Sequence, residues 1–312
     1  MKYSKSFRII AVLLCVACAV SVLSITVGAD MGPKASVRIL FENMGDDLCY
    51  GTLLSKTESV GPSSVWDGTA VNAGHNENEN YPYANLDYET WKAFAEYTDP
   101  DGYFFLQEGW LVSETKKIEW TYYPPSSFKI LLYYPKTNNF VASGICERYA
   151  FDTYYTADME NMSVSSVEYG GEINTALMLT VSRSYDCTQE IVFLAARIVI
   201  TILIEMAIAL LFGFREKKQI LLLTGVNTAT QILLNVLLNI ANYNSGPMVC
   251  VILYMLFEVI VFVIEAVIYC TVMNRLSEQS KRKRFYVIYS LIANAASFGI
   301  GILLSRTLPG IF

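Results

Sequence analysis

Four long apolar segments in the C-terminal part of the chain constrain its fold more than any other feature. They cover residues 191–214, 219–241, 248–273 and 285–305. Each is long enough to cross a bilayer core, which needs about 20 helical residues. The sequence therefore predicts an all-α four-helix transmembrane bundle and excludes an ordinary soluble protein.

The charges between these segments predict which way the bundle faces. Basic residues gather in loops 215–218 and 274–284, whereas loop 242–247 carries no charge. Cytoplasmic loops carry an excess of Lys and Arg, so we expect the two basic loops in the cytoplasm and the C-terminus outside. The basic run 281–284 could also attract anionic lipid, but topology alone accounts for it.

The N-terminus has the pattern of a secretory signal. Basic residues precede an apolar run at 9–27, and the small residues at its end predict that a signal peptide of residues 1–29 is cleaved before Asp30. Two alternatives stay open, namely a lipoprotein signal acylated at Cys18 and an uncleaved anchor. All three place residues 30–190 outside the cytoplasm.

Residues 30–190 differ in charge from the rest of the chain. They hold 24 acidic and 10 basic side chains, whereas residues 191–312 hold 5 acidic and 10 basic ones. This division predicts an acidic extracytoplasmic domain followed by a membrane domain. It also argues against nucleic acid as a partner, because duplex affinity comes from Lys and Arg that neutralise phosphates.

The patterning of the outer domain predicts an α+β fold with a mainly antiparallel sheet. Trp91, Phe94 and Ala95 recur at helical spacing and indicate a short helix within 87–97. The polar stretch 72–80 is typical of a loop. Aromatic and β-branched runs predict four strands, at 36–41, 103–112, 117–123 and 128–134. Asn, Asp, Pro and Gly predict two turns, at 99–102 and 136–139.

Aromatic residues are concentrated in the outer domain. It contains 15 of the 21 Tyr and all four Trp, which are Trp66, Trp91, Trp110 and Trp120. Exposed Tyr and Trp can stack on sugar rings or grip peptides. The same residues can form the core of a domain of this size, and we favour that interpretation.

Three cysteines lie in the outer domain, where disulfides can persist. We predict a Cys49–Cys146 disulfide, with Cys187 left over, although the other two pairings stay open. The loop so closed has roughly 100 residues, which corresponds to about 4.7 kcal/mol in the chain-entropy model.

Each apolar segment carries one polar face, and the four faces are expected to turn inward because lipid cannot satisfy polar atoms. The candidate site residues on these faces are Arg197, Glu205, Asn227, Gln231, Asn235, Glu258, Glu265 and Asn294. At 1.5 Å of rise per residue they fall into levels. From the outer surface inward these are Arg197 with Asn235, Glu258 with Gln231, then Glu205 with Asn227 and Asn294, and lastly Glu265.

Three membrane glutamates exceed the one Arg that could pair with them. A charged carboxylate at the bilayer centre costs at least ~2.5–3.5 kcal/mol, so we expect some of them to be protonated, bonded to amides or paired with a cation. The residues then form either a site for a cation, a proton or a polar ligand, or uncharged hydrogen bonds between helices. Such a bond stabilises the bundle by ~0.6 kcal/mol. The two hypotheses are evenly matched.

Enzyme signatures are sparse, so an enzyme is the less favoured class. The single histidine, His75, excludes a histidine-based site in the membrane, and no nucleophile elbow or phosphate-binding loop occurs. A glutamate-dependent intramembrane hydrolase is conceivable through Glu258 and Glu265, which are ~10 Å apart on one helix. No cofactor, metal or catalytic residue is predicted.

Several short sequence motifs along the chain are familiar as a set. They occur at 50–54 with 61–62, 101–107, 120–125, 147–151 and 211–215, together with Asn227, Thr230, Gln231, Asn235, Glu258 and Glu265. In these the chain resembles a group of uncharacterised membrane proteins of Gram-positive anaerobic bacteria, with a signal peptide, an outer domain and four spans. The resemblance implies a plasma-membrane location with the domain facing the envelope, and it implies no activity.

Two functional hypotheses follow. The first is an envelope sensor or accessory subunit, whose outer domain binds a ligand or protein partner. The second is a small ion-coupled transporter or translocation subunit that uses Glu205, Glu258 and Glu265. The expected partners are the lipid bilayer and either another membrane or envelope protein or further copies of the chain.

Overall fold

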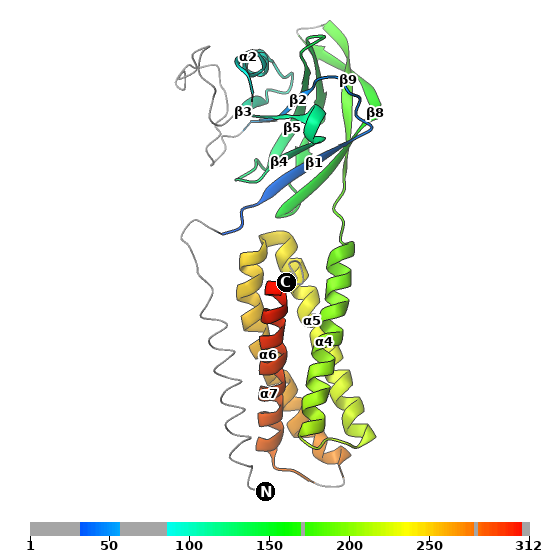
Figure 1. Ribbon diagram of the computed structural model, residues 1–312, viewed down its shortest axis with the longest axis vertical. Helices are drawn as coiled ribbons and strands as arrows, with labels where there is room; N and C mark the ends of the chain where they lie inside the picture. The colour runs from blue at the N-terminus through cyan, green and yellow to red at the C-terminus, as the bar shows by residue number, and fades with distance from the viewer. Residues whose placement is uncertain (1–31, 57–85, 170–171, 278–279, 308–312) are drawn as a thin grey trace. The chain divides into compact units, whose positions relative to one another are not determined.

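The computed structural model describes residues 32–56, 86–169, 172–277 and 280–307. The described chain forms two compact units. One consists of Lys34–Tyr185, and the other contains the helices that follow Asp186. Figure 1 shows that the first unit is rich in strands and that the second is built from long helices.

A nine-stranded sheet forms most of the first unit. Its strand order is β3-β2-β5-β6-β9-β8-β1-β4, and β7 pairs with β5. β1 pairs with β8 and β6 with β9 in parallel, whereas the other pairs are antiparallel. The strands are β1 (Ser36–Glu42), β2 (Tyr50–Ser55), β3 (Phe104–Leu111), β4 (Lys117–Trp120), β5 (Ser127–Tyr134), β6 (Asn139–Ser143), β7 (Cys146–Glu147), β8 (Asp152–Tyr169) and β9 (Glu172–Arg183).

The sheet is barrel-like because its two end strands contribute to one core. Leu106 of β3 and Ile118 of β4 are fully buried in the same apolar cluster. Helix α3 (Val112–Thr115) joins these two strands, and the rings of Trp110 and Trp120 have centroids 5.7 Å apart. A flat sheet would keep β3 and β4 far apart, so this shared core requires strong curvature.

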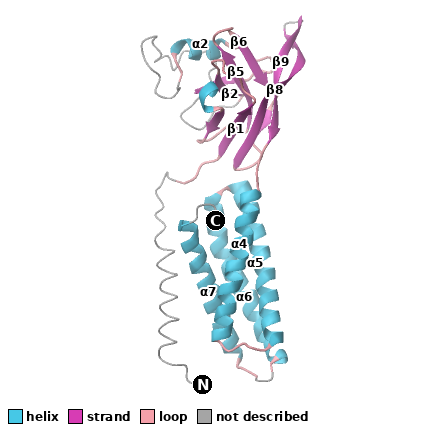
Figure 2. Cartoon of the chain, turned by 45° about the vertical axis from the view of Figure 1, so that its right-hand side comes forward, coloured by secondary structure: helices cyan, strands magenta, loops and turns pink. Residues whose placement is uncertain are grey.

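The opposite face of β2, β3 and β5 is covered by helix α2 (Tyr88–Glu96), as Figure 2 shows. Trp91 and Phe94 of this helix pack on Phe105, with ring centroids 6.3 Å and 5.4 Å from it. The side chain of Asp87 caps the helix by accepting a hydrogen bond from the Thr90 amide at 2.8 Å. Side chains alternate between the two faces of a strand, so this part of the sheet is buried on both sides.

These elements confirm much of the predicted pattern. Strands β1, β3, β4 and β5 overlap the four predicted strands, and helix α2 lies within 87–97. The barrel-like curvature and the strands β2, β8 and β9 were not predicted. The predicted loop 72–80, with His75, lies outside the described residues, as does Trp66.

The predicted turn at 99–102 is held by a buried ion cluster. The Lys129 ammonium lies 2.8 Å from Asp99 Oδ1 and also contacts the Asp101 carboxylate. Asp99 and Lys129 are only 5 % and 4 % exposed. Burial opposes the charge on Lys129, but the hydrogen bonds with Asp101 and Asp99 outweigh it and raise the pKa of the ammonium.

Removing this cation is expected to unfold the outer domain more easily. In Lys129→Met, the Asp99 carboxylate stays buried without its ion partner, which typically costs about 3–5 kcal/mol. Because all four Trp belong to the outer domain, denaturant unfolding followed by Trp fluorescence measures this change. Lys136→Met is the control, because the Lys136–Asp47 pair is 3.8 Å apart and its side chains are 80 % and 74 % exposed. Equal midpoints for the two variants would contradict the prediction.

The predicted Cys49–Cys146 disulfide is wrong. Both residues are free thiols. Cys49 precedes β2 and Cys146 belongs to β7, and they lie beside opposite ends of β5. Tyr50 pairs with Tyr133, whereas Cys146 pairs with Phe128. A separation of about five residues along a strand spans roughly 17 Å, and a disulfide tolerates about 7 Å between Cα atoms. Burial raises the pKa of Cys49 to about 12 and that of Cys146 to about 11.

Among the described residues, the second unit contains four helices that are long and apolar enough to cross a membrane. The protein is therefore a multi-pass membrane protein. The helices overlap the predicted segments and extend up to four residues beyond them at most ends, whereas α4 begins and ends three residues earlier. They are α4 (Thr188–Leu211), α5 (Lys217–Ser245), α6 (Pro247–Leu276) and α7 (Lys283–Thr307).

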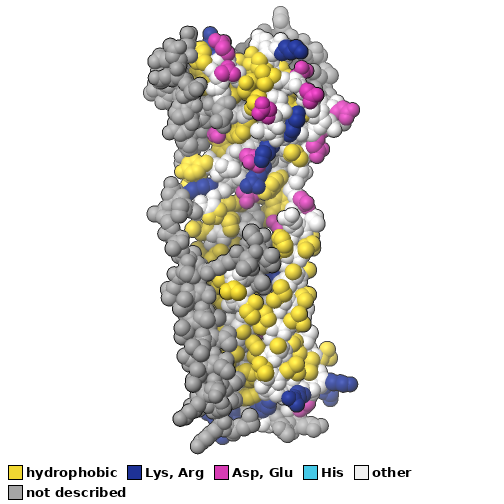
Figure 3. All heavy atoms as spheres, viewed as in Figure 1, with side chains coloured by type: hydrophobic (Ala, Val, Ile, Leu, Met, Phe, Trp, Pro, Cys, Tyr) yellow, Lys and Arg dark blue, Asp and Glu magenta, His cyan; other side chains and the backbone are white. Residues whose placement is uncertain are grey.

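Apolar side chains cover the outside of these helices, and polar ones lie inside. Leu211, Leu221 and Leu203 are 82 %, 75 % and 65 % exposed, whereas Glu205 and Asn227 are fully buried. Figure 3 shows the apolar side chains over the visible helix surface. This reversed distribution matches a bilayer as solvent.

Candidate functional site in the helix bundle

The candidate site begins at Glu265 of α6, which links three helices. One carboxylate oxygen accepts a hydrogen bond from the Thr230 hydroxyl of α5 at 2.9 Å, and the other accepts one from the Asn294 amide of α7 at 2.7 Å. Glu265 is 1 % exposed. Both oxygens of this carboxyl group are thus used inside the bundle.

Glu205 of α4 connects the fourth helix to the same group of residues. Its Oε1 accepts a hydrogen bond from the Ser297 hydroxyl of α7 at 3.2 Å, and its carboxyl group interacts electrostatically with that of Glu265. The Tyr289 hydroxyl also donates to the backbone carbonyl of Glu205 at 3.5 Å. Two acidic groups from two helices therefore share one buried region.

A second group of contacts lies next to this region. The Tyr269 hydroxyl of α6 donates a hydrogen bond to Asn227 Oδ1 of α5. Both residues are fully buried. These contacts tie α5 to α6 one helical turn away from the Glu265–Thr230 bond.

Arg197 of α4 belongs to a separate polar layer. Its guanidinium donates a hydrogen bond to Asn235 Oδ1 at 2.6 Å, and Asn235 donates in turn to the Gln231 backbone carbonyl at 2.7 Å. Arg197 also interacts electrostatically with Glu258, which is hydrogen-bonded to Tyr254. The basic residue therefore lies nearer to Glu258 than to the Glu205–Glu265 region.

The structure brings most of the predicted residues together but corrects one level. Arg197 and Asn235 meet as predicted. Glu265 was placed deeper than Asn294, yet the two are hydrogen-bonded. Side chains on a helix tilt toward its N-terminus, so the long Glu265 side chain reaches back along α6 by part of a turn.

The predicted site residues did not include Thr230, Tyr289 and Ser297. Thr230 is three residues after Asn227 and Ser297 is three residues after Asn294, so helical spacing places them on the same inward faces. That spacing was the available signal. It is weak, because a hydroxyl in a membrane helix can also bond to its own backbone.

Apolar layers enclose the polar region on both sides. Toward the α4–α5 and α6–α7 connections, Phe212, Phe214 and Tyr286 lie in a buried cluster, and the Lys281 ammonium lies 4.7 Å and 4.4 Å from the ring centroids of Phe214 and Phe285. Toward the α5–α6 connection, the buried cluster contains Leu234, Leu238, Tyr254 and Val261. Apolar layers therefore close both ends of the polar region.

Several buried polar atoms in this interior have no hydrogen-bond partner, which marks where a ligand, proton or ion could act. Among the described residues of the bundle these atoms include Glu205 Oε2, Glu258 Oε2, Asn227 Nδ2, Gln231 Nε2 and Asn294 Oδ1. Leaving such an atom unsatisfied costs about 1–3 kcal/mol. No group of three or more His, Cys, Asp or Glu that could hold a metal ion occurs within the described ranges.

The contacts favour hydrolysis least among the three functions considered. Both oxygens of Glu265 accept hydrogen bonds from protein groups, and Glu258 is bonded to Tyr254. An acid and base pair must reach one substrate together. These two carboxyl groups instead have separate partners.

In comparisons with known proteins, no family model, curated protein or solved structure matches this chain. The resemblance to membrane proteins of Gram-positive anaerobes is not tested by these comparisons and stays a prediction.

The Glu265 bonds are expected to contribute little stability each. Glu265→Leu removes both, and we expect a loss of about 1 kcal/mol, because interhelical bonds average ~0.6 kcal/mol and both partners keep backbone acceptors at 3.0–3.1 Å. SDS unfolding followed by far-ultraviolet circular dichroism measures it. Glu265→Gln is the matched control and is expected to lose less.

A double-mutant cycle with Thr230→Val isolates the Thr230 bond. We expect a coupling free energy of about 0.6 kcal/mol between Glu265→Leu and Thr230→Val. Strictly additive effects would mean that this bond contributes nothing to stability.

Proposed function

We propose that the protein is an envelope sensor or accessory subunit of the plasma membrane. In this proposal a signal peptide directs the outer domain and the C-terminus to the outside, and loops 215–218 and 274–284 face the cytoplasm. The clustering of basic residues in these two loops supports that orientation. The outer domain then meets a ligand or protein partner, and the bundle anchors it.

The closure of the bundle interior at both ends is the observation that carries this proposal. Polar side chains link all four helices, through Glu265 to Thr230 and Asn294 and through Glu205 to Ser297. Buried apolar clusters lie on both sides of them. Such a bundle favours a fixed, non-conducting unit over an open pathway.

Exposed apolar residues of the outer domain offer contact surface. Trp91 and Trp120 are at most 9 % exposed and belong to cores, so they are not available for binding. Phe104, Tyr122 and Ile145 are 44 %, 38 % and 56 % exposed. Aromatic and aliphatic side chains of this kind commonly anchor protein partners.

Photocrosslinking from these residues tests the sensor or accessory proposal. A photoreactive amino acid at Phe104, Tyr122 or Ile145 of the full chain in native membranes is expected to give a discrete product from at least one position. The same amino acid at the exposed Lys136 is the control. Mass spectrometry identifies the product, and purified protein in liposomes is expected to pass no H⁺, Na⁺ or K⁺. Equal labelling from every position, or ion flux, would contradict the proposal.

An ion-coupled transporter or translocation subunit is the second candidate, and two unpartnered carboxylate oxygens favour it. Glu205 Oε2 and Glu258 Oε2 are buried without a hydrogen-bond partner. A bound proton or cation would satisfy each of them. Four helices are few for a complete transporter, so this candidate implies an assembly of several copies.

Thermal stability across Na⁺, K⁺, Ca²⁺ and pH tests the second candidate. A specific ion at 100 times its dissociation constant stabilises the folded state by ~2.7 kcal/mol. We expect Glu205→Gln and Glu258→Gln to lose that response and Glu265→Gln to keep part of it, because the Glu265 oxygens already have protein partners. If all three variants respond as the wild type does, the glutamates are structural and only the sensor or accessory proposal remains.

A further inference from the structure

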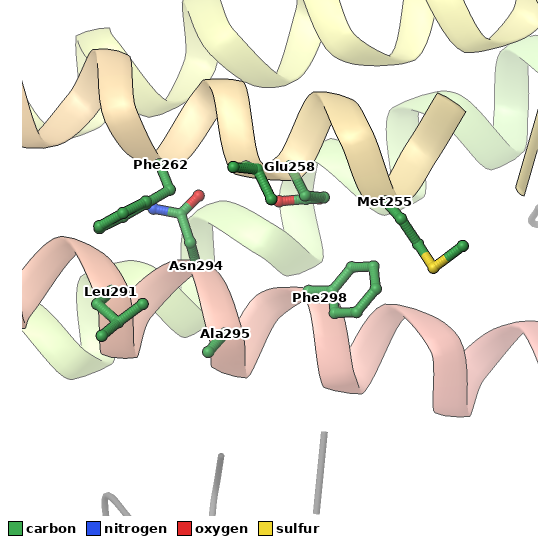
Figure 4. Close-up of a pocket in the computed structure, with 8 residues that line it drawn as sticks. Met255, Glu258, Phe262, Leu291, Asn294, Ala295 and Phe298 are labelled. Atoms are coloured by element: carbon green, nitrogen blue, oxygen red, sulfur yellow. The ribbon is translucent and has the colours of Figure 1, made fainter. Parts of the chain in front are cut away.

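A groove opens between α6 and α7 on the outside of the bundle (Figure 4). It has a volume of about 300 Å³. Apolar side chains form most of its wall, among them Met255, Phe262, Leu291, Ala295 and Phe298. We propose that this groove binds a single-chain amphiphile whose polar end is a hydrogen-bond donor, such as an alkylamine or an alkanol.

Two polar side chains in the wall decide the chemistry of the ligand. Glu258 and Asn294 both line the groove, and Figure 4 shows them between the two helices. Glu258 Oε2 and Asn294 Oδ1 are buried and have no hydrogen-bond partner. Asn294 is only 4 % exposed, so water does not readily satisfy its oxygen.

Both unpartnered atoms are oxygens, and the nearby donor is already used. The Asn294 amide nitrogen donates to Glu265 Oε2 at 2.7 Å and to the Ser290 carbonyl at 3.0 Å. Both oxygens are buried behind the groove wall, so a ligand whose polar end reaches them meets acceptors. An ammonium or hydroxyl group complements them, whereas a carboxylate would face a second acidic group without a donor.

Depth separates this ligand from an ordinary phospholipid. Glu258 is eleven residues after Pro247, the first residue of α6, which corresponds to roughly 17 Å along the helix. The bilayer core is about 30 Å thick, so Glu258 lies near its middle. Headgroups of two-chain lipids stay at the surface. A small single-chain molecule can carry its polar end to this depth, and the groove volume matches the small end of ligand pockets.

Photoreactive probes of equal chain length test the site in the full-length protein. The protein is placed in phosphatidylcholine nanodiscs with diazirine analogues of dodecylamine, dodecanol or dodecanoic acid, and labelled residues are identified by mass spectrometry. We expect the amine and the alcohol to label groove residues of α6 and α7 about five-fold more than the acid, the change expected for one hydrogen bond.

Two variants separate groove binding from simple partitioning into lipid. Ala295→Leu fills the groove and is expected to abolish the preferential labelling. Glu258→Gln keeps the size of the side chain but removes its charge, so the amine is expected to lose labelling while the alcohol keeps it. Leu203→Ala, on the lipid-exposed face of α4, is the control and is expected to leave labelling unchanged.

Three results would overturn the site. The first is equal labelling of lipid-facing residues on all four helices. The second is labelling that Ala295→Leu and Glu258→Gln leave unaltered, in variants whose circular dichroism matches the wild type. The third is that the probes are excluded and that a photoreactive amino acid placed at position 295 cross-links to another copy or to a partner helix. The groove would then be a helix interface. Ion flux or partner capture measures the proposed function separately, so the two can fail independently.

Discussion

The absence of water in the bilayer core is the constraint on which the bundle depends. A polar side chain there must find its partners within the protein, and Glu265 does so with Thr230 on one neighbouring helix and Asn294 on another. Glu205 adds the remaining helix through Ser297. The helices therefore pack so that these groups turn inward, with apolar residues left to the lipid.

The outer domain follows the opposite rule, because water is its solvent. Its sheet buries one apolar face in the barrel-like core and, at β2, β3 and β5, a second face under helix α2, and polar groups are enclosed among them. The Lys129–Asp99 pair is the clearest of these, since both residues are nearly inaccessible and stabilise each other's charge. Each unit thus has its own source of stability.

The bundle separates two kinds of unsatisfied polar atom by their access. Glu205 Oε2 lies in the bundle interior, where a proton or a small cation is the natural partner. Asn294 Oδ1 and Glu258 Oε2 are buried as well, but their residues line a groove between α6 and α7. Asn294 of α7 therefore takes part in both, because its amide nitrogen donates to Glu265 and its residue lines the groove.

The sequence by itself determined the features that rest on composition and period. Apolar segments of membrane length predicted four helices, and four-residue spacing placed Glu205, Asn235 and Asn294 on inward faces. The tertiary structure decided which atoms meet. The rise per residue does not include the reach of a side chain, so it set Glu265 too deep. The strand patterns in the sequence carry no information on sheet register. The register places Cys49 beside one end of β5 and Cys146 beside the other. The curl of the sheet and the α6–α7 groove arise from contacts between segments distant in the chain, and no local pattern encodes them.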